Sequence, residues 1–512
     1  MIKKLITRLL TGKGKNSASS LGKRVEAGVN VHGIDPRHVD RRAAEVVHTL
    51  QQAGFEAYIV GGAVRDLLLG LRPKDFDVAT DATPEEVKRL FRRAFIIGKR
   101  FRIVHVVYGR GREHEVIEVS TFRAQLDSAQ AQQVHGNERT HKRELASVSH
   151  AVDASGRVLR DNVWGPQDED AARRDFTINA MYYDPETQVV VDYHHGIQDA
   201  KKRVLRMIGD PALRYREDPV RIIRAVRFAA KLSGLGFEIE THTRAPLAAS
   251  VALLSDVPQS RMFDEMMKLL QTGHASASVE QLRRLKLKGI YPLLDLAVER
   301  ADDPMVAAVY ADTDRRVSEG KPVAPSFLLA CLLWSDVHRS YEKRLAGSSR
   351  TPAMQALHEA IDEVFETRVG DVSGRGRLGS DMREIWLMQP RFDRRGHHSA
   401  LTLVEQPRFR AGFDFMRLRS LIGEVDEDVV IWWEAFSMGD EDHRRDMIEA
   451  VRLQQQSQRG SRTHRVAADG APEQAADAEG ATKKRRRRRR KPNGKGGGSA
   501  DAAPSGSQPS ED

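Results

Sequence analysis

The sequence contains a single cysteine, Cys331, among 512 residues, which excludes an intramolecular disulfide and a cysteine-based zinc cluster. We therefore expect a reducing, cytoplasmic location. No run is long and apolar enough for a membrane span, and charges interrupt residues 1–10, MIKKLITRLL, too often for a secretory signal. These ten residues could still form a basic amphipathic turn that touches a membrane surface.

Several enzyme motifs are also missing from the sequence. The 18 histidines are scattered, with no His-Asp dipeptide and no zinc-ligand spacing, which argues against a metal-dependent phosphohydrolase module. No Gly-x-Ser-x-Gly, Walker loop or dinucleotide fingerprint stands in a suitable setting. The length allows about three domains. The apolar content of 40% is enough for sizeable cores.

Two aspartates, Asp75 and Asp77, are the most informative residues that are present. They flank Phe76 after a turn at Pro73, and the pattern predicts a strand. Residues i and i+2 of a strand point to the same side, so both carboxylates face one way while Phe76 and Val78 face the core. Carboxylates that share one open site can hold Mg²⁺ for phosphoryl transfer. An isolated Asp-x-Asp is more often a solvated turn, so the surrounding sequence must show whether these two aspartates form a metal site.

A glycine pair, Gly61 and Gly62, lies upstream of the aspartates, directly after the apolar run 57–60. Residues without side chains let backbone N–H groups and the start of the next helix approach phosphates. A Gly-Gly alone indicates only a turn. The spacing to the acidic pair, with Lys74 beside it, makes the combination specific.

This combination resembles the nucleotidyltransferase superfamily, in the branch that holds bacterial poly(A) polymerases and class II tRNA CCA-adding enzymes. The head motifs of that branch, Gly-Gly-x-Val-Arg-Asp and Asp-x-Asp, are present at residues 61–66 and 75–77. The resemblance is close between about residues 44 and 270 and looser beyond. It implies an α+β fold: a polymerase-β-like nucleotidyltransferase head with a mixed sheet and flanking helices, followed by an all-α neck and C-terminal helical domains.

The resemblance also implies the catalytic groups. Asp75 and Asp77 would bind Mg²⁺, and Glu118, in a segment that alternates like a half-buried strand, would be a third carboxylate. Asp175 lies in Arg-Arg-Asp-Phe-Thr-Ile-Asn-Ala (residues 173–180), which resembles a motif near the nucleotide sugar, and we take it as a further functional carboxylate. The sequence leaves open whether Glu118 or Asp175 completes the metal site. Candidate contacts to the phosphates or sugar are Gly61, Gly62, Arg65 and Arg174.

Asp218 and Arg221, in Glu-Asp-Pro-Val-Arg, resemble the base-recognition motif of the branch. Three positions apart on a predicted helix, they would be neighbours on one face. An aspartate accepts and an arginine donates, which suits the amino group and ring nitrogen of adenine. Cytosine offers the same arrangement, so the pair does not distinguish an enzyme that uses only ATP from one that also uses CTP. A surface ion pair is the alternative explanation.

The segment 96–106, IIGKRFRIVHV, favours a poly(A) polymerase over a CCA-adding enzyme, because bacterial poly(A) polymerases resemble one another at these positions. Viewed without that resemblance, it is a strand preceded by a basic turn. We have no physical account from the sequence of why it would select adenylate tailing.

Positive charge is concentrated at the C-terminal end. Residues 451–512 hold fourteen Lys/Arg and seven Asp/Glu, which is seven of the ten net positive charges, and Lys483 to Lys491 form an unbroken basic block. The rest of this tail is rich in Gly, Ser, Pro, Ala and Gln, so we expect it to be disordered and to bind an anionic polymer. A nuclear-localisation or merely solubilising tail would have a similar composition.

The expected organisation has five parts. They are a basic flexible leader (1–36), a nucleotidyltransferase head (37–198), a helical neck with nucleobase recognition (199–275), a helical RNA-binding body (276–455) and the disordered basic tail (456–512). The resemblance implies template-independent addition of AMP from ATP to single-stranded RNA 3′ ends, with release of pyrophosphate, in RNA processing and turnover. A CCA-adding enzyme is the nearest alternative. An inactive RNA-binding protein is disfavoured because all three candidate acids are present.

Overall fold

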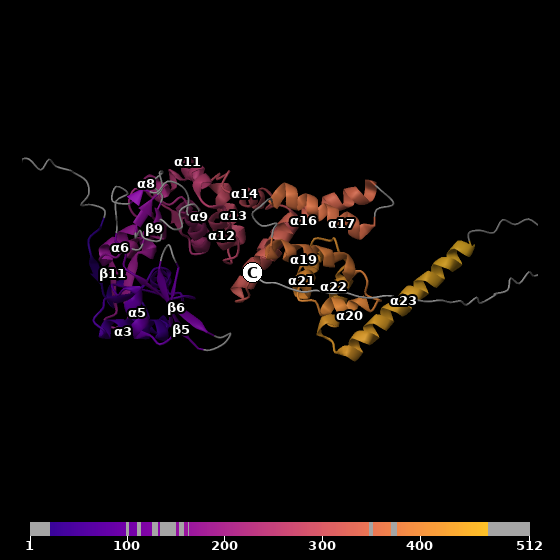
Figure 1. Cartoon of the computed structure of the whole chain (residues 1–512), viewed down its shortest axis with the longest axis horizontal. Coiled ribbons are helices and arrows are strands. Elements are labelled where there is room, and N and C mark those ends of the chain that lie inside the picture. Colours follow the sequence, from indigo (N-terminus) through magenta and orange to yellow (C-terminus); the bar gives the residue numbers. More distant parts are fainter. Residues whose placement is uncertain are drawn as a thin grey trace, which may run out of the picture. The chain divides into compact units, whose positions relative to one another are not determined.

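The computed structural model describes residues 21–98, 102–109, 114–124, 132–133, 150–152, 158–161, 163–347, 352–369 and 376–468 (Figure 1). The predicted membrane-touching turn at 1–10, residues 99–101 of the segment 96–106, and residues 469–512 of the tail lie outside these ranges. No helix in the described part of the chain is long and apolar enough to cross a membrane.

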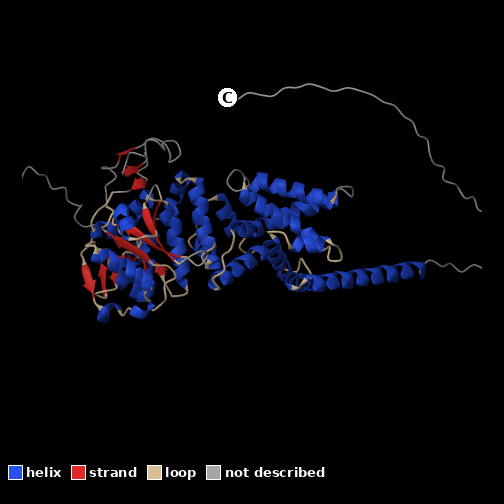
Figure 2. Ribbon diagram, turned by 60° about the horizontal axis from the view of Figure 1, so that its bottom comes forward, coloured by secondary structure: helices blue, strands red, loops and turns tan. Residues whose placement is uncertain are grey.

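The head is built on an eight-stranded sheet with the order β1-β11-β10-β2-β3-β6-β5-β4 (Figure 2). Neighbouring strands are antiparallel except β3 and β6, which are parallel. The predicted mixed sheet is therefore confirmed. The strands are β1 (Val25–Ala27), β2 (Ala57–Val60), β3 (Asp77–Thr80), β4 (Ala94–Ile97), β5 (Ile103–Tyr108), β6 (Glu115–Thr121), β10 (Met181–Asp184) and β11 (Val189–Asp192).

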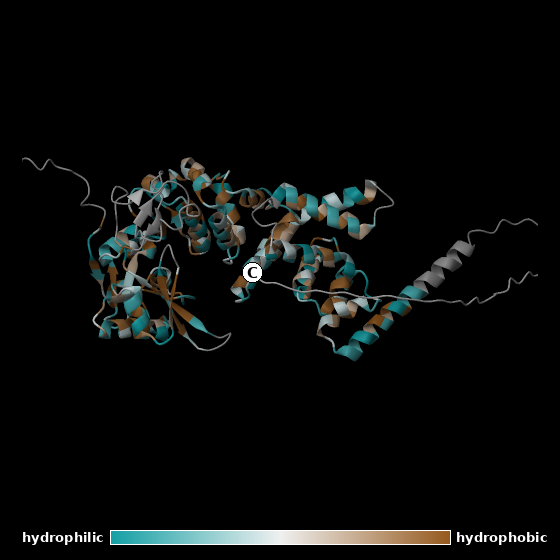
Figure 3. Ribbon diagram, viewed as in Figure 1, coloured by the Kyte–Doolittle hydropathy of each residue, from teal (hydrophilic) through white to brown (hydrophobic). Residues whose placement is uncertain are grey.

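The two faces of this sheet are covered to different extents. Helices α3 (Arg41–Gln52) and α5 (Pro84–Leu90) pack on one face and bury the apolar side chains there, including Val78 and Val119. On the opposite face, α6 (Gln167–Arg173) contributes Ala171 to a smaller core around Tyr182. That core covers strands β2, β10 and β11, and Figure 3 shows the apolar composition of the head strands in brown. Phe95 and Ile97 of β4 stay exposed on this second face.

The neck follows through α7 (Gly196–Lys202), and its main helix is α9 (Val220–Ser233). Apolar residues at helical spacing bury one face of α9, among them Val226 and Leu232. The neck is not purely helical, because β12 (Val204–Leu205) and β13 (Glu238–Ile239) pair in parallel. The other elements are α8 (Pro211–Glu217), α10 (Thr241–Arg244), α11 (Leu247–Ser250), the 3₁₀ helix η6 (Val251–Asp256) and α12 (Gln259–Leu270).

The body is helical, as predicted. One hydrophobic core continues from Val226 in the neck through Leu329 to Phe415, so the expected boundary at residue 275 does not separate two cores. A second core surrounds Trp433 and Phe436. The helices are α13 (Ala275–Arg284), α14 (Pro292–Glu299), α15 (Pro304–Ser318), α16 (Pro325–Gly347), α17 (Ala353–Val364), α19 (Arg377–Phe392), α20 (Ser399–Val404), α21 (Phe409–Leu421), α22 (Glu427–Met438) and α23 (Glu441–Ala468), with a π-helix, η7, at Phe365–Val369.

Helix α23 differs from the expectation for the tail. We predicted disorder from residue 456, but the helix continues to Ala468. Arginine, glutamine and glutamate have high helix propensity, and a lack of apolar residues does not prevent a polar helix. Three short strands also occur between β6 and α6, namely β7 (Gln132–Gln133), β8 (His150–Val152) and β9 (Val158–Asp161), which form a separate sheet.

Candidate active site

Asp77 and Glu118 lie side by side on the two parallel strands of the sheet. Asp77 is the first residue of β3, and its partner in the β3–β6 register is Glu118. Neighbouring strands are about 4.8 Å apart, and paired residues project to the same face. Phe76 and Val78 are buried, whereas Asp75 and Asp77 are exposed, which confirms the predicted alternation. The structure therefore brings Glu118 to the acidic pair.

The electrostatics of this cluster favour a cation. Partial removal from water raises the pKa of Asp77 to about 6, and the charges of Glu118 and Asp75 add to this effect, while Arg174 opposes it. The carboxylate is open on one side yet crowded by other acids, so its ionised form is destabilised. A divalent cation would relieve this repulsion. In the ranges that the structure describes, no three His, Cys, Asp or Glu side chains are already grouped closely enough to hold a metal, so an ion would have to draw the acids together.

Arg174 lies at the C-terminal end of α6 and connects the acids to the glycine turn. Its guanidinium donates to Asp170 at 3.0 Å and to the Tyr182 hydroxyl at 3.2 Å. A Cβ on Gly61 would be 3.7 Å from Nη1 of Arg174, and the charge of Arg174 acts on Asp77. The glycine turn, Arg174 and Asp77 thus surround one region, and their shared contact with a nucleotide stays a prediction.

The glycine turn itself needs glycine. Gly61 caps helix α4 (Gly62–Leu68) with a φ of 78°, in the region that residues with side chains avoid. Arg65, on the first turns of α4, is only 1% exposed. Its guanidinium donates to Asn179 at 2.8 Å and pairs with Asp66 at 2.7 Å. Arg65 therefore anchors the turn to the segment after α6, and direct contact with a triphosphate stays a prediction.

Asp175 occupies a different place from the one we expected. It is buried and accepts hydrogen bonds from the guanidinium of Arg224 on α9, with Nε at 2.9 Å, and from the backbone N–H of Phe176 at 2.8 Å. Burial alone would raise its pKa, but the charge and hydrogen bonds of Arg224 hold the pKa at about 2. Asp175 is not among the charges that chiefly act on Asp77. It connects head and neck, so Glu118 is the better candidate for the third carboxylate.

The predicted helix that would carry both Asp218 and Arg221 is two helices. Asp218 lies in the break between α8 and α9, because Pro219 lacks the N–H that would continue the helix. Asp218 forms an ion pair with Arg261 at 3.0 Å, and Arg221 forms one with Glu217 at 3.2 Å. The two remain close, since the Arg221 N–H donates to the Asp218 carbonyl at 3.0 Å. Their role in base recognition stays a prediction.

Sequence reasoning missed two residues of this region. His105 of β5 is the register partner of Glu118 on the side away from Asp77, and its Nε2 is 3.5 Å from the Glu118 carboxylate. Arg224, which pairs with Asp175, was not singled out from the sequence either. The alternation of residues 103–108 could have placed His105 on the face of Glu118, but no local signal identifies the long-range partner of Arg224.

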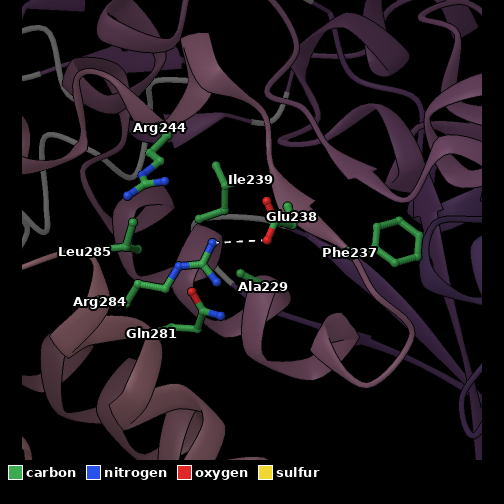
Figure 4. Close-up of a pocket in the computed structure, with 8 residues that line it drawn as sticks. All are labelled: Ala229, Phe237, Glu238, Ile239, Arg244, Gln281, Arg284 and Leu285. Carbon is green, nitrogen blue, oxygen red and sulfur yellow. Dashed lines mark hydrogen bonds and ion pairs between the residues drawn. The ribbon is translucent and has the colours of Figure 1, made fainter.

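A small basic hollow lies between the neck and the first helix of the body, α13 (Figure 4). Arg244, Arg284 and Gln281 surround it, and Arg284 pairs with Glu238 at 3.2 Å. Its volume of about 10 Å³ is enough for only about one water molecule, so it is no site for a nucleotide. It places two exposed arginines side by side, Arg244 from the neck and Arg284 from α13.

Known families match three parts of the chain. "Poly A polymerase head domain" matches residues 57–206, "Probable RNA and SrmB-binding site of polymerase A" matches residues 236–297, and "Polymerase A arginine-rich C-terminus" matches residues 349–492. The first contains the acidic pair and the glycine turn, and the second contains Arg244 and Arg284 of the basic hollow. The fold and the site thus define a nucleotidyltransferase.

Individual relatives show which family of nucleotidyltransferases the chain is similar to. Poly(A) polymerase I from Salmonella typhi is 39% identical over 416 residues, covering 79% of this chain and 84% of the relative. Poly(A) polymerase I from Haemophilus influenzae is 38% identical, covering 81% and 88%. The CCA-adding enzyme of Bacillus pumilus is 34% identical but covers only 49% of this chain and 55% of the relative. The chain belongs to the bacterial poly(A) polymerase I family, whose members are polynucleotide adenylyltransferases.

Solved structures of CCA-adding enzymes are more distant. The Bacillus stearothermophilus enzyme in complex with CTP is 24% identical with a TM-score of 0.43, covering 81% of this chain and 98% of that one. The Thermotoga maritima enzyme complexed with tRNA is 18% identical with a TM-score of 0.43, covering 84% and 86%.

Proposed function

We propose that this protein adds AMP from ATP to the 3′ ends of single-stranded RNA, without a template, and releases pyrophosphate. The observation that carries the proposal is the share of the chain that each class of relative matches. The match to poly(A) polymerase I covers 79% of the chain, whereas the match to the Bacillus pumilus CCA-adding enzyme covers 49%. The activity belongs to RNA processing and turnover in the cytoplasm, a reducing compartment that suits a chain whose one cysteine is free and buried.

In this proposal Asp75 and Asp77 hold Mg²⁺, with Glu118 as the third carboxylate. The donor set fits a hard divalent cation, because it is made of carboxylate oxygens. Removal from water, together with the charges of Glu118 and Asp75, raises the pKa of Asp77, and a cation would offset both effects. When bound, such ions help to deprotonate the RNA 3′-hydroxyl and offset charge on the attacking and leaving oxygens. Ionised Asp77 is the form that this role needs.

The other residues bind and orient the nucleotide. The backbone of Gly61 and Gly62 comes close to the triphosphate because no side chain intervenes. Arg174, positioned by Asp170 and Tyr182, contributes a positive charge beside the reacting phosphate. Arg65 acts through Asn179 by holding the glycine turn in place.

Adenine recognition is assigned to Asp218 and Arg221. Ion pairs with Arg261 and Glu217 restrict the two side chains before the base arrives. RNA would follow basic surfaces of the neck and of the adjoining helix α13, including Arg244 and Arg284 at the hollow of Figure 4.

The test is an incorporation assay with an unstructured RNA, ATP as the only nucleotide, and Mg²⁺. Long ladders of added adenylate are expected. Addition that stops after one residue, requires CTP first and occurs only on trimmed tRNA would identify a CCA-adding enzyme instead. No incorporation under either condition would leave an RNA-binding protein without this activity.

A further inference from the structure

Four side chains form a straight row across the edge half of the head sheet. Asp77 of β3 is paired with Glu118 of β6, Glu118 with His105 of β5, and His105 with Phe95 of β4. Residues paired in register project to the same face of a sheet. The row therefore begins at the proposed catalytic acids and ends at an aromatic ring on the sheet edge.

This half of the sheet is open on the face of the row. Phe95 is 54% exposed and Ile97, two residues along the same strand, is 44% exposed. The side chains of His105 and Glu118 are 29% and 52% exposed. Val104 and Val119, which point to the other face, are 1% exposed, because α3 and α5 cover them. Phe95 and Ile97 lie two residues apart on one strand, so they form a contiguous apolar surface on the face that carries the acids.

We propose that Phe95 and His105 form the platform on which the last nucleotides of the RNA substrate stack, so that its 3′-hydroxyl is presented to Asp77 and Glu118. This inference rests on the proposed function. The occupant follows from continuity: the platform and the acids share one face and one register row, so an RNA strand lying on the platform leads to the acids that would act on its terminus. An open sheet face with aromatic side chains is a common way to bind single-stranded RNA, because every base has a flat face to stack.

The dimensions suit two or three nucleotides. Strands are about 4.8 Å apart, so Phe95, three strands from Asp77, is roughly 14 Å away along the row. Stacked bases are roughly 3.4 Å apart, and an extended single strand covers more per nucleotide. His105, whose Nε2 is 3.5 Å from the Glu118 carboxylate, would lie below the terminal nucleotide, and Phe95 would lie below a nucleotide further from the end.

The platform also gives a physical meaning to the segment 96–106. Residues 94–97 form the edge strand β4, which carries Phe95, and residues 103–108 form its inner neighbour β5, which carries His105. Phe95 directly precedes the segment 96–106, and His105 lies within it. A platform that stacks any terminal base, without reading a tRNA shape, would let the enzyme accept many RNA ends and its own growing product. Repeated tailing requires this tolerance.

The experiment couples Phe95→Ala to the removal of single bases from the RNA. Steady-state kinetics are measured with short RNA primers that are intact or abasic at the first, second or third nucleotide from the 3′ end. Phe95→Ala should raise KM for the intact primer about tenfold, the size expected for one lost base stack, and leave KM for ATP unchanged. At one of the three positions, removal of the base should raise the primer KM of the wild type but should not raise the KM of Phe95→Ala any further.

Controls separate the possible failures. Phe95→Trp should restore primer binding, because the ring is kept, and Val29→Ala, at a side chain 45% exposed on another element, should change nothing. Thermal unfolding should be the same for the wild type and Phe95→Ala, since the ring is exposed. If the increases in KM caused by Phe95→Ala and by base removal add at all three positions, Phe95 stacks on none of these bases and the platform is wrong. That result would leave the proposed adenylyltransferase activity intact. If the wild type incorporates no ATP, the proposed function itself fails.

Discussion

Asp175 of the head accepts hydrogen bonds from Arg224 of the neck helix α9, and the pair holds the two parts together through a buried contact. Asn179, which accepts a hydrogen bond from Arg65, also donates to Asp175 at 3.3 Å. The glycine turn is thereby connected to α9 through a chain of four side chains. Asp175 would thus affect catalysis through the position of the turn, without contacting the substrate.

Asp175→Asn should destabilise the protein because it leaves Arg224 without its charged partner. Breaking a buried pair costs about 3 to 5 kcal/mol, and we expect about 3 kcal/mol because the Arg224 side chain is 33% exposed. Urea unfolding measures the loss. Asp302→Asn, at an exposed partner of Arg283, is the matched control and should cost below about 1 kcal/mol. Equal losses in the two variants would contradict the role assigned to the buried pair.

The same pair predicts a pH dependence of stability. The pKa of Asp175 is held at about 2 in the folded protein, below that of an unfolded chain, which is about 3.9. Its contribution is therefore fully present above about pH 4 and is lost as the pH falls toward about 2. Unfolding free energies of the wild type and Asp175→Asn, measured between about pH 5 and 3, should converge toward the acid end. Parallel curves would contradict the prediction.

Asp77→Ala should abolish AMP incorporation while folding and RNA binding are nearly unchanged. The side chain is exposed and contributes little to the core, but its loss removes a carboxylate from the proposed metal site. Incorporation is measured with saturating ATP and Mg²⁺, and Asp302→Ala is the control. A variant that keeps more than about a tenth of the wild-type rate would refute the metal assignment, since removal of such a group costs at least a hundredfold.

Magnesium should stabilise the protein less below about pH 6. The pKa of Asp77 is raised to about 6, so protons and cations compete for this carboxylate in that range. Without metal, the folded state binds more protons than the unfolded state between about pH 4 and 6, so stability contributed by this group falls as the pH rises. The rise in Tm on addition of Mg²⁺ should therefore be larger at about pH 7.5 than at about pH 5.5. Asp77→Asn should weaken this pH dependence. An equal rise in Tm at both pH values in the wild type would contradict the prediction.

A chain that ends after Ala468 should bind RNA more weakly and with a flatter salt dependence. The deletion removes the basic block from Lys483 to Lys491, whose contacts would be to phosphates. Each neutralised phosphate of a single strand contributes roughly 0.7 to the log–log salt slope, so the loss of four contacts would lower the slope by about 3. RNA affinity is measured across a salt series, with kcat at saturating RNA as the control. An unchanged slope would show that the basic block does not bind RNA.

Local patterns in the sequence were enough to predict much of the site. The alternation of Asp75, Phe76, Asp77 and Val78 determines which side chains are buried, because a strand has a period of two. Gly61 adopts the positive φ that a turn without side chains allows. The break at Pro219 could also have been anticipated from the missing N–H, but the motif was treated there as one helix.

The sequence by itself determined the class of fold, the acidic pair and the glycine turn, since these depend on residues close together in the chain. Only the tertiary structure favours Glu118 over Asp175 as the proposed third carboxylate, because strand order places β6 beside β3, whereas Asp175 pairs with Arg224 of α9. The same strand order aligned Phe95 and His105 with the acids. Contacts between strands and helices that are distant in the sequence leave no local pattern, since they depend on how the whole head packs.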